Sequence, residues 1–116
     1  MQRKSPKWIE DIRACASFII ETTAQMELAD YRANQLVKSA VERNFEVIGE
    51  AINRLARHDA ETAARLGDYP RIIAFRNILI HGYDLVDNDQ VWKVIKENLP
   101  ALKERAEVLL RETPQG

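Results

Sequence analysis

A short stretch from Arg76 to Tyr83 gathers side chains that can do chemistry on a phosphate ester. Arg76 carries a permanent charge and can bind a phosphate through two parallel hydrogen bonds. His81 can take or give a proton near neutral pH, and Tyr83 can donate, accept or act as a nucleophile. Asn77 adds an amide that can orient the histidine or contact a ligand. These residue types predict a site that acts on a phosphodiester.

The spacing sets a condition on this site. Arg76 and Tyr83 are seven residues apart and share a face of a continuous helix, but His81 lies about 140° from Arg76 on an ideal helix. Convergence therefore needs the helix to end or distort at His81 and Gly82. The alternative is structural: Arg76 is a surface cation, His81 caps a helix C-terminus and Tyr83 packs a loop. Short patterns of this kind also arise by chance.

Few glycines and prolines interrupt the chain, four of each, which favours an all-helical fold. The first helix is expected from Ser5 to about Gln25, with Pro6 in its first turn, and 26–33 is expected to be a connection with a short turn. The second helix carries the clearest apolar stripe, at Val37, Val41, Phe45, Ile48, Ile52 and Leu55. Gly49 within it costs about 1 kcal/mol relative to alanine, so we expect another helix to approach closely there.

The second half predicts two more helices. Residues 58–68 form a polar connector with a short helix over 60–66, and a third helix runs over 70–81 until Gly82. Asp87 is expected to cap the fourth helix, with Gln90 as its capping-box partner. Pro100 should kink or split that helix. Its apolar stripe is Val91, Ile95, Leu102, Ala106 and Leu109. The predicted fold is all-α, an antiparallel bundle of four main helices plus a short connector helix.

Composition bounds the function. A chain of 116 residues predicts one domain, and a net charge of −1 argues against non-specific coating of nucleic acid while permitting a local basic cleft. The single cysteine, Cys15, cannot form an internal disulfide and is expected to be a buried thiol. No signal peptide opens the chain and no apolar run is long enough to span a membrane. We therefore expect a soluble cytoplasmic protein.

No metal site or cofactor is expected. His58 should be solvent-exposed in the polar connector. Asp84, Asp87 and Asp89 could in principle hold magnesium, but Asp87 is better explained as a helix cap. Glu50 lies off the main apolar stripe, where it is either solvated or in contact with a motif residue or a partner.

The motif also carries a family resemblance. Arg76, four residues, His81, one residue and Tyr83 resemble the R-x4-6-H-x-Y signature of HepT-like proteins in the HEPN superfamily. The segments AVERNFEVIGEA (40–51) and RNILIHGYDLVDNDQVWKVIKENLPAL (76–102) are similar to that family's helices. The family layout fits residues 8–110, which implies one HepT-like, HEPN-type domain over 1–116 with its core over about 6–112.

The resemblance implies a toxin of a type VII-like toxin–antitoxin pair. It would be a homodimer and a metal-independent RNA endonuclease, with Arg76 and His81 catalytic and Asn77 supporting them. The partner would be an MntA-type nucleotidyltransferase antitoxin that silences the toxin by adding AMP to Tyr83. The alternative is a non-catalytic helical module that binds a nucleotidyltransferase or a nucleotide.

The chemistry agrees with a dimer. Metal-free RNA cleavage needs a base, an acid and a cation at the phosphate, yet each chain supplies one motif histidine. A symmetric dimer would place two copies of His81 and two of Arg76 in one cleft. AMP on Tyr83 would bring a bulky anion beside these cations and exclude RNA.

Overall fold

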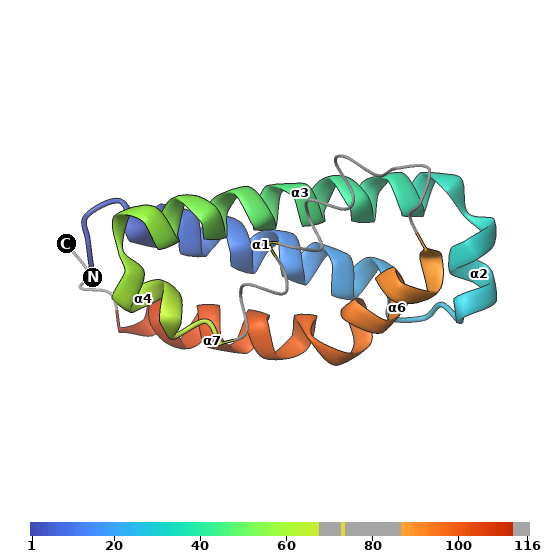
Figure 1. The fold of residues 1–116 in the computed structure, drawn as a ribbon. Coiled ribbons are helices and arrows are strands. Elements are labelled where there is room, and N and C mark those ends of the chain that lie inside the picture. Colours follow the sequence, from blue (N-terminus) through green and yellow to red (C-terminus); the bar gives the residue numbers. More distant parts are fainter. Residues whose placement is uncertain (68–72, 74–86, 113–116) are drawn as a thin grey trace.

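The computed structural model describes residues 1–67, 73 and 87–112. Within these ranges the chain is all-α, as predicted, and no strand occurs. The helices are, in order, α1 (Ser5–Thr23), α2 (Leu28–Ala33), α3 (Gln35–His58), α4 (Ala60–Ala64), α6 (Asn88–Glu97) and α7 (Leu99–Arg111). Figure 1 shows α3 and α7 on either side of α1, both running opposite to it.

The long helix α1 is the centre of the described bundle, because it packs against both α3 and α7. Its buried apolar residues recur at spacings of three and four: Ile9, Ile12, Ala16 and Ile19. The predicted stripe of α3 is confirmed, with Val37 partly buried and the other five residues fully buried. Each fully buried aliphatic side chain contributes about 1.5–3 kcal/mol, so the buried stripes of α1 and α3 contribute strongly to stability.

The corner between α3 and α4 is held by one carboxylate. Asp59 lies between the two helices and its Oδ1 accepts from the Thr62 backbone N–H at 3.3 Å, which caps α4. Its Oδ2 accepts from the Ser5 hydroxyl at 2.7 Å and from the Gln2 backbone N–H at 2.8 Å. The start of α1 is thereby tied to the end of α3. The predicted short connector helix is confirmed and ends two residues earlier than expected.

Residues 26–33 are more ordered than predicted. Where a connection with a short turn was expected, α2 forms with Glu27 as its cap, and the Asp30 carboxylate accepts from the Glu27 backbone N–H at 2.8 Å. The reason for the error is that a helix this short shows no apolar period. Its Tyr31 is fully buried and packs against the Trp92 ring of α6, with 5.5 Å between centroids.

The last part of the chain follows the prediction closely. Asp87 caps α6, but its Oδ1 accepts from the Asp89 backbone N–H at 2.9 Å, so Gln90 is not its capping partner. Pro100 splits the expected helix: α6 ends at Glu97 and α7 begins at Leu99, with Pro100 in its first turn. The five residues of the predicted stripe are all buried. The helix expected over 70–81 lies outside the described residues except for Ile73, which is helical and packs against the core.

Candidate functional site

The predicted motif lies outside the residues that the structure describes. Arg76, Asn77, His81 and Tyr83 all belong to the range 74–86. Their convergence, and the helix end at Gly82 that it requires, stay predictions. The described helices nevertheless define surfaces on which a substrate or partner can be held.

Two of the acidic residues that follow the motif, Asp87 and Asp89, have structural roles. Asp84 lies outside the described residues, and Asp87 is engaged as the cap of α6. Asp89 accepts from Arg32 of α2, with 2.8 Å between Nε and Oδ1, and so ties α2 to α6. Among residues 1–67, 73 and 87–112, no three or more His, Cys, Asp or Glu side chains group as metal ligands would. The interpretation of Asp87 as a helix cap is confirmed.

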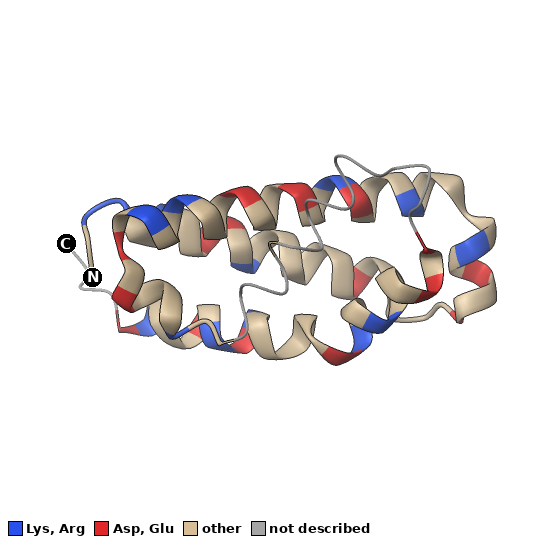
Figure 2. Cartoon of the chain, viewed as in Figure 1, with Lys and Arg blue, Asp and Glu red and all other residues tan. Residues whose placement is uncertain are grey.

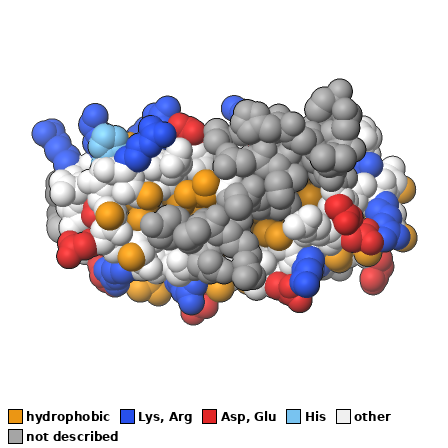
Figure 3. All heavy atoms as spheres, in the orientation of Figure 1, with side chains coloured by type: hydrophobic (Ala, Val, Ile, Leu, Met, Phe, Trp, Pro, Cys, Tyr) orange, Lys and Arg blue, Asp and Glu red, His pale blue; other side chains and the backbone are white. Residues whose placement is uncertain are grey.

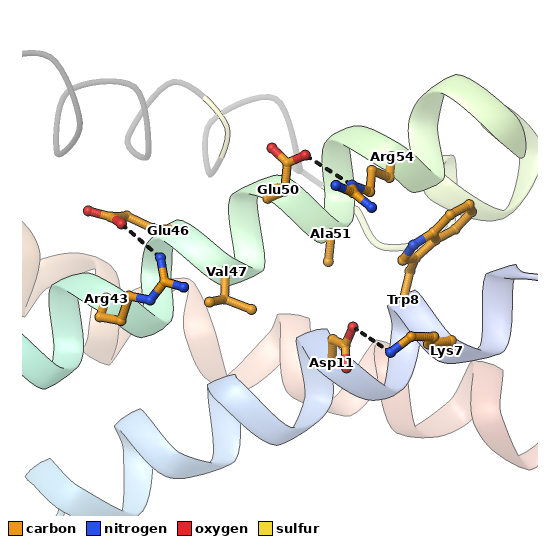
Figure 4. A pocket seen from close by; sticks show the side chains of 9 residues that line it. All are labelled: Lys7, Trp8, Asp11, Arg43, Glu46, Val47, Glu50, Ala51 and Arg54. Atoms are coloured by element: carbon orange, nitrogen blue, oxygen red, sulfur yellow. Dashed lines mark hydrogen bonds and ion pairs between the residues drawn. The ribbon is translucent and has the colours of Figure 1, made fainter.

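A groove of about 370 Å³ runs between α1 and α3. Figure 4 shows the side chains that line it: Lys7, Trp8, Asp11, Arg43, Glu46, Val47, Glu50, Ala51 and Arg54. Each of its cations faces an acid. The nitrogen–oxygen distances are 3.9 Å for Lys7–Asp11, 3.3 Å for Arg43–Glu46 and 3.0 Å for Arg54–Glu50.

This internal pairing leaves the α1–α3 groove with little net charge. The Glu50 side chain is 42% exposed and accepts from Arg54. Contact of Glu50 with a motif residue or a partner stays a prediction. Because its charged groups are compensated locally, the groove has no strong preference for an anionic or a cationic ligand.

A second hollow, of about 590 Å³, adjoins the groove at the end of the bundle. It is lined by Gln2, Arg3, Lys4, Trp8, Glu50, Arg54, Arg57 and His58. The Trp8 and His58 rings stack in it, with 5.4 Å between centroids and 25° between planes. Figure 3 shows basic side chains and the described histidine gathered at this end of the molecule.

The sequence interpretation missed this hollow, which we name the basic end. Trp8 of α1 is partly buried and packs against the core, so its apolar surroundings alone do not mark it as part of a site. His58 is exposed, as predicted, but it is the last residue of α3 and not part of a connector. The available signal was two basic pairs, Arg3–Lys4 and Arg57–His58, at the ends of two helices expected to run antiparallel.

The single cysteine lies away from the basic end. Cys15 of α1 is partly buried. Burial raises the pKa of its thiol, and the nearby Asp11 carboxylate adds to the effect. The thiolate is the reactive form, so the raised pKa disfavours reactivity, although the thiol is less buried than predicted. Among the described helices, none has both the length and the apolar character needed to cross a membrane.

Comparison with known proteins gives the family. The family model described as "Ribonuclease HepT-like" matches residues 12–109. The chain belongs to the HepT-like ribonuclease family. The matched range includes the positions of Arg76, His81 and Tyr83, so the family resemblance seen in the sequence is confirmed.

Several curated proteins are similar to the HepT-like chain over nearly its full length. "Putative RNase MJ1380" of Methanocaldococcus jannaschii is 31% identical, covering 93% of this chain and 98% of its own. "Probable ribonuclease HepT" of Thermococcus cleftensis is 30% identical, with coverages of 94% and 98%. "Putative RNase TTE0752" of Caldanaerobacter subterraneus subsp. tengcongensis is 26% identical, with 94% and 97%. No solved structure gives a significant match to the chain.

Proposed function

We propose that this HepT-like protein is the RNA-cleaving toxin of a toxin–antitoxin pair, acting in the cytoplasm as one domain over residues 1–116. The observation that carries the proposal is the family match over residues 12–109, which includes the signature Arg76, His81 and Tyr83. The names of the similar proteins, all of which describe an RNase, support the same activity.

The proposed reaction uses the RNA as its own nucleophile. His81 removes the proton from a ribose 2′-hydroxyl, and the 2′-oxygen attacks the adjacent phosphorus. The bond from phosphorus to the 5′-oxygen breaks, and an acid protonates that leaving oxygen. Arg76 stabilises the charge that develops on the phosphoryl oxygens. The products are a 2′,3′-cyclic phosphate and a 5′-hydroxyl, and no metal ion takes part. Asn77 orients His81 or the phosphate.

The acid in this scheme comes from a second copy of the chain. One protomer supplies one motif histidine, so the base is His81 of one subunit and the acid is His81 of the partner subunit. A homodimer with a composite cleft is therefore part of the proposal. Dilution below the dimer dissociation constant should abolish the activity per protomer, and a fully active monomer would refute the composite site.

Silencing is proposed to occur by AMP transfer from an MntA-like nucleotidyltransferase. The phenolic oxygen of Tyr83 attacks the α-phosphorus of ATP and pyrophosphate leaves. The added phosphate places a negative charge beside Arg76 and His81 and occupies the position that an RNA phosphate would take.

Growth provides the cellular test. Expression of the wild type without its antitoxin should arrest growth, and His81→Ala should relieve the arrest while expressing to the same level as a dimer. If both proteins arrest growth equally, catalysis at His81 is not the cause. If neither does, the chain acts as an interaction module that binds a nucleotidyltransferase or a nucleotide.

A further inference from the structure

The basic end combines two features that a single-stranded RNA requires. Four cations line the hollow, Arg3, Lys4, Arg54 and Arg57, against one carboxylate, that of Glu50. Within the same hollow the Trp8 and His58 rings are stacked. Single strands are held by cations that follow the phosphates and by aromatic faces on which bases stack.

Three of the four cations at this end are unpaired within the described residues. Within the described part of the chain, Arg3, Lys4 and Arg57 form no ion pair, and all three are exposed. Arg54 alone is paired, with Glu50. The charge is a local concentration, because the whole chain carries −1. Figure 2 shows basic residues of the N-terminal segment and of the last turns of α3 at the same end of the bundle.

Helix stability does not account for the two cations before α1, Arg3 and Lys4. Arg3 and Lys4 precede the first turn of α1, where the helix dipole favours acids over bases, and that turn contains no acid. Arg57 at the end of α3 does suit the dipole. The buried acid among the described residues, Asp59, is already engaged by Gln2, Ser5 and Thr62. The basic residues before α1 therefore favour a role in binding.

The stacked pair is well placed for a base. Trp8 is held by its contact with the core, and His58 is exposed on the last turn of α3. In Figure 4 the Trp8 ring projects from α1 toward the end of α3 that carries Arg54. Because the two rings already pack against each other, their side chains lose little conformational freedom when a base stacks on the pair.

We propose that the basic end is an RNA-holding surface, on which phosphates contact Arg3, Lys4 and Arg57 and a base stacks on the Trp8–His58 pair. This rests on the proposed ribonuclease function and names where a strand is held outside the motif. The surface recognises phosphate and base faces, so it accepts RNA of many sequences.

The test uses the full-length protein, unmodified at Tyr83, and a fluorescent single-stranded RNA whose 2′-oxygens are methylated. This probe cannot be cleaved, because the nucleophile is blocked. The variant Arg3→Gln/Lys4→Gln/Arg57→Gln should bind it about 10- to 100-fold more weakly at about 50 mM salt. The slope of log affinity against log salt should fall by about 2, since each contact to a single strand contributes about 0.7.

A matched control removes the same charge at the other end of the bundle. Lys38→Gln/Lys93→Gln/Lys96→Gln alters the first turns of α3 and the helix α6, and both lie toward the end of the bundle opposite the basic end in Figure 1. It should change affinity by less than about threefold. If both variants weaken RNA binding equally, the loss of affinity reflects net charge alone, and the proposal is overturned.

The stacking claim has its own readout. Trp92→Phe leaves Trp8 as the single tryptophan of the chain, and RNA should quench its fluorescence in step with binding. Binding without quenching would overturn the stacking role.

Failure of the surface and failure of the ribonuclease can be told apart by assaying cleavage in parallel. If the wild type cleaves RNA but the basic-end variant binds RNA as tightly as the wild type, the RNA-holding surface is refuted and the ribonuclease is not. Binding that depends on the basic end without any cleavage would keep the surface and refute the nuclease. No binding and no cleavage would refute both. If the basic-end variant binds RNA normally but no longer binds the nucleotidyltransferase, the basic end is a protein interface and the proposal is overturned.

Discussion

Replacing Asp59 by asparagine tests how the start of α1 is joined to the corner between α3 and α4. Asp59 is only 8% exposed, and its carboxylate accepts from Gln2 and Ser5 at Oδ2 and from Thr62 at Oδ1. The substituted amide would keep the Thr62 contact through its oxygen, and the Ser5 hydroxyl could turn to accept from its nitrogen. The Gln2 N–H would lose its acceptor.

A hydrogen bond to a charged group contributes about 1.5–3 kcal/mol, so Asp59→Asn should lower the free energy of unfolding by about that amount at pH 7. With a urea slope of about 1–3 kcal/mol per molar, the midpoint should fall by about 1 M. Asp87→Asn is the matched control, because it changes an exposed helix cap that accepts one N–H. Asparagine caps as well as aspartate, so this control should change stability by less than about 0.5 kcal/mol.

The contribution of Asp59 to the free energy of unfolding should depend on pH in a defined direction. Burial by itself raises the pKa of Asp59, but the hydrogen bonds from Gln2, Ser5 and Thr62 outweigh it and hold the pKa well below the ordinary 3.8. Because the folded-state pKa is depressed, the Asp59 carboxylate stabilises the fold at pH values above its unfolded-state pKa. This stabilisation is lost as the pH falls from the unfolded-state pKa through the folded-state pKa. The difference between wild type and Asp59→Asn should be constant from about pH 5 to 8 and shrink below about pH 4.

Urea unfolding at fixed protomer concentration measures both quantities, since a dimer's stability depends on concentration. A variant as stable as the wild type at pH 7 would refute the reasoning. So would a difference that grows as the pH falls.

Further predictions concern the core and the proposed modification. The Tyr31 hydroxyl is buried without a hydrogen-bond partner among the described residues, so Tyr31→Phe should leave urea stability unchanged or raise it by up to about 1 kcal/mol; a clear loss would reveal a missing partner. Ile48→Ala should cost about 2–5 kcal/mol by the same assay, whereas Leu36→Ala, at a side chain 85% exposed, should stay within about 0.5 kcal/mol; equal costs would contradict the assigned core. Incubation with the nucleotidyltransferase and ATP should add AMP to Tyr83 and not to Tyr31, as mapped by peptide mass; AMP on another residue would refute the proposed site.

Most of the described helices could be predicted because the patterns that mark them involve residues close together in the sequence. The stripe of α3, the cap at Asp87 and the break at Pro100 each depend on residues within one or two turns of each other. Prediction failed where the pattern was short. The six residues of α2 carry no apolar period, and its cap is Glu27, a residue type outside the favoured caps.

The individual contacts between distant segments could not be predicted, although two basic pairs at helix ends indicated that charge would gather at one end of the bundle. Ser5 donates to Asp59, 54 residues away, and Trp8 stacks on His58. Both contacts depend on α1 and α3 lying side by side in a particular register, which the apolar stripes alone do not set. The basic end follows from that register. The motif came from residue chemistry and family resemblance, and the described residues leave its geometry a prediction.

The most direct test of the central claim is cleavage of end-labelled RNA by the purified protein in the presence of EDTA, with His81→Ala beside the wild type. We expect the wild type alone to cleave, leaving 2′,3′-cyclic phosphate ends. Equal cleavage by both proteins would place the activity elsewhere. Absence of cleavage by folded, dimeric wild type unmodified at Tyr83 would contradict the proposal that this chain is a ribonuclease.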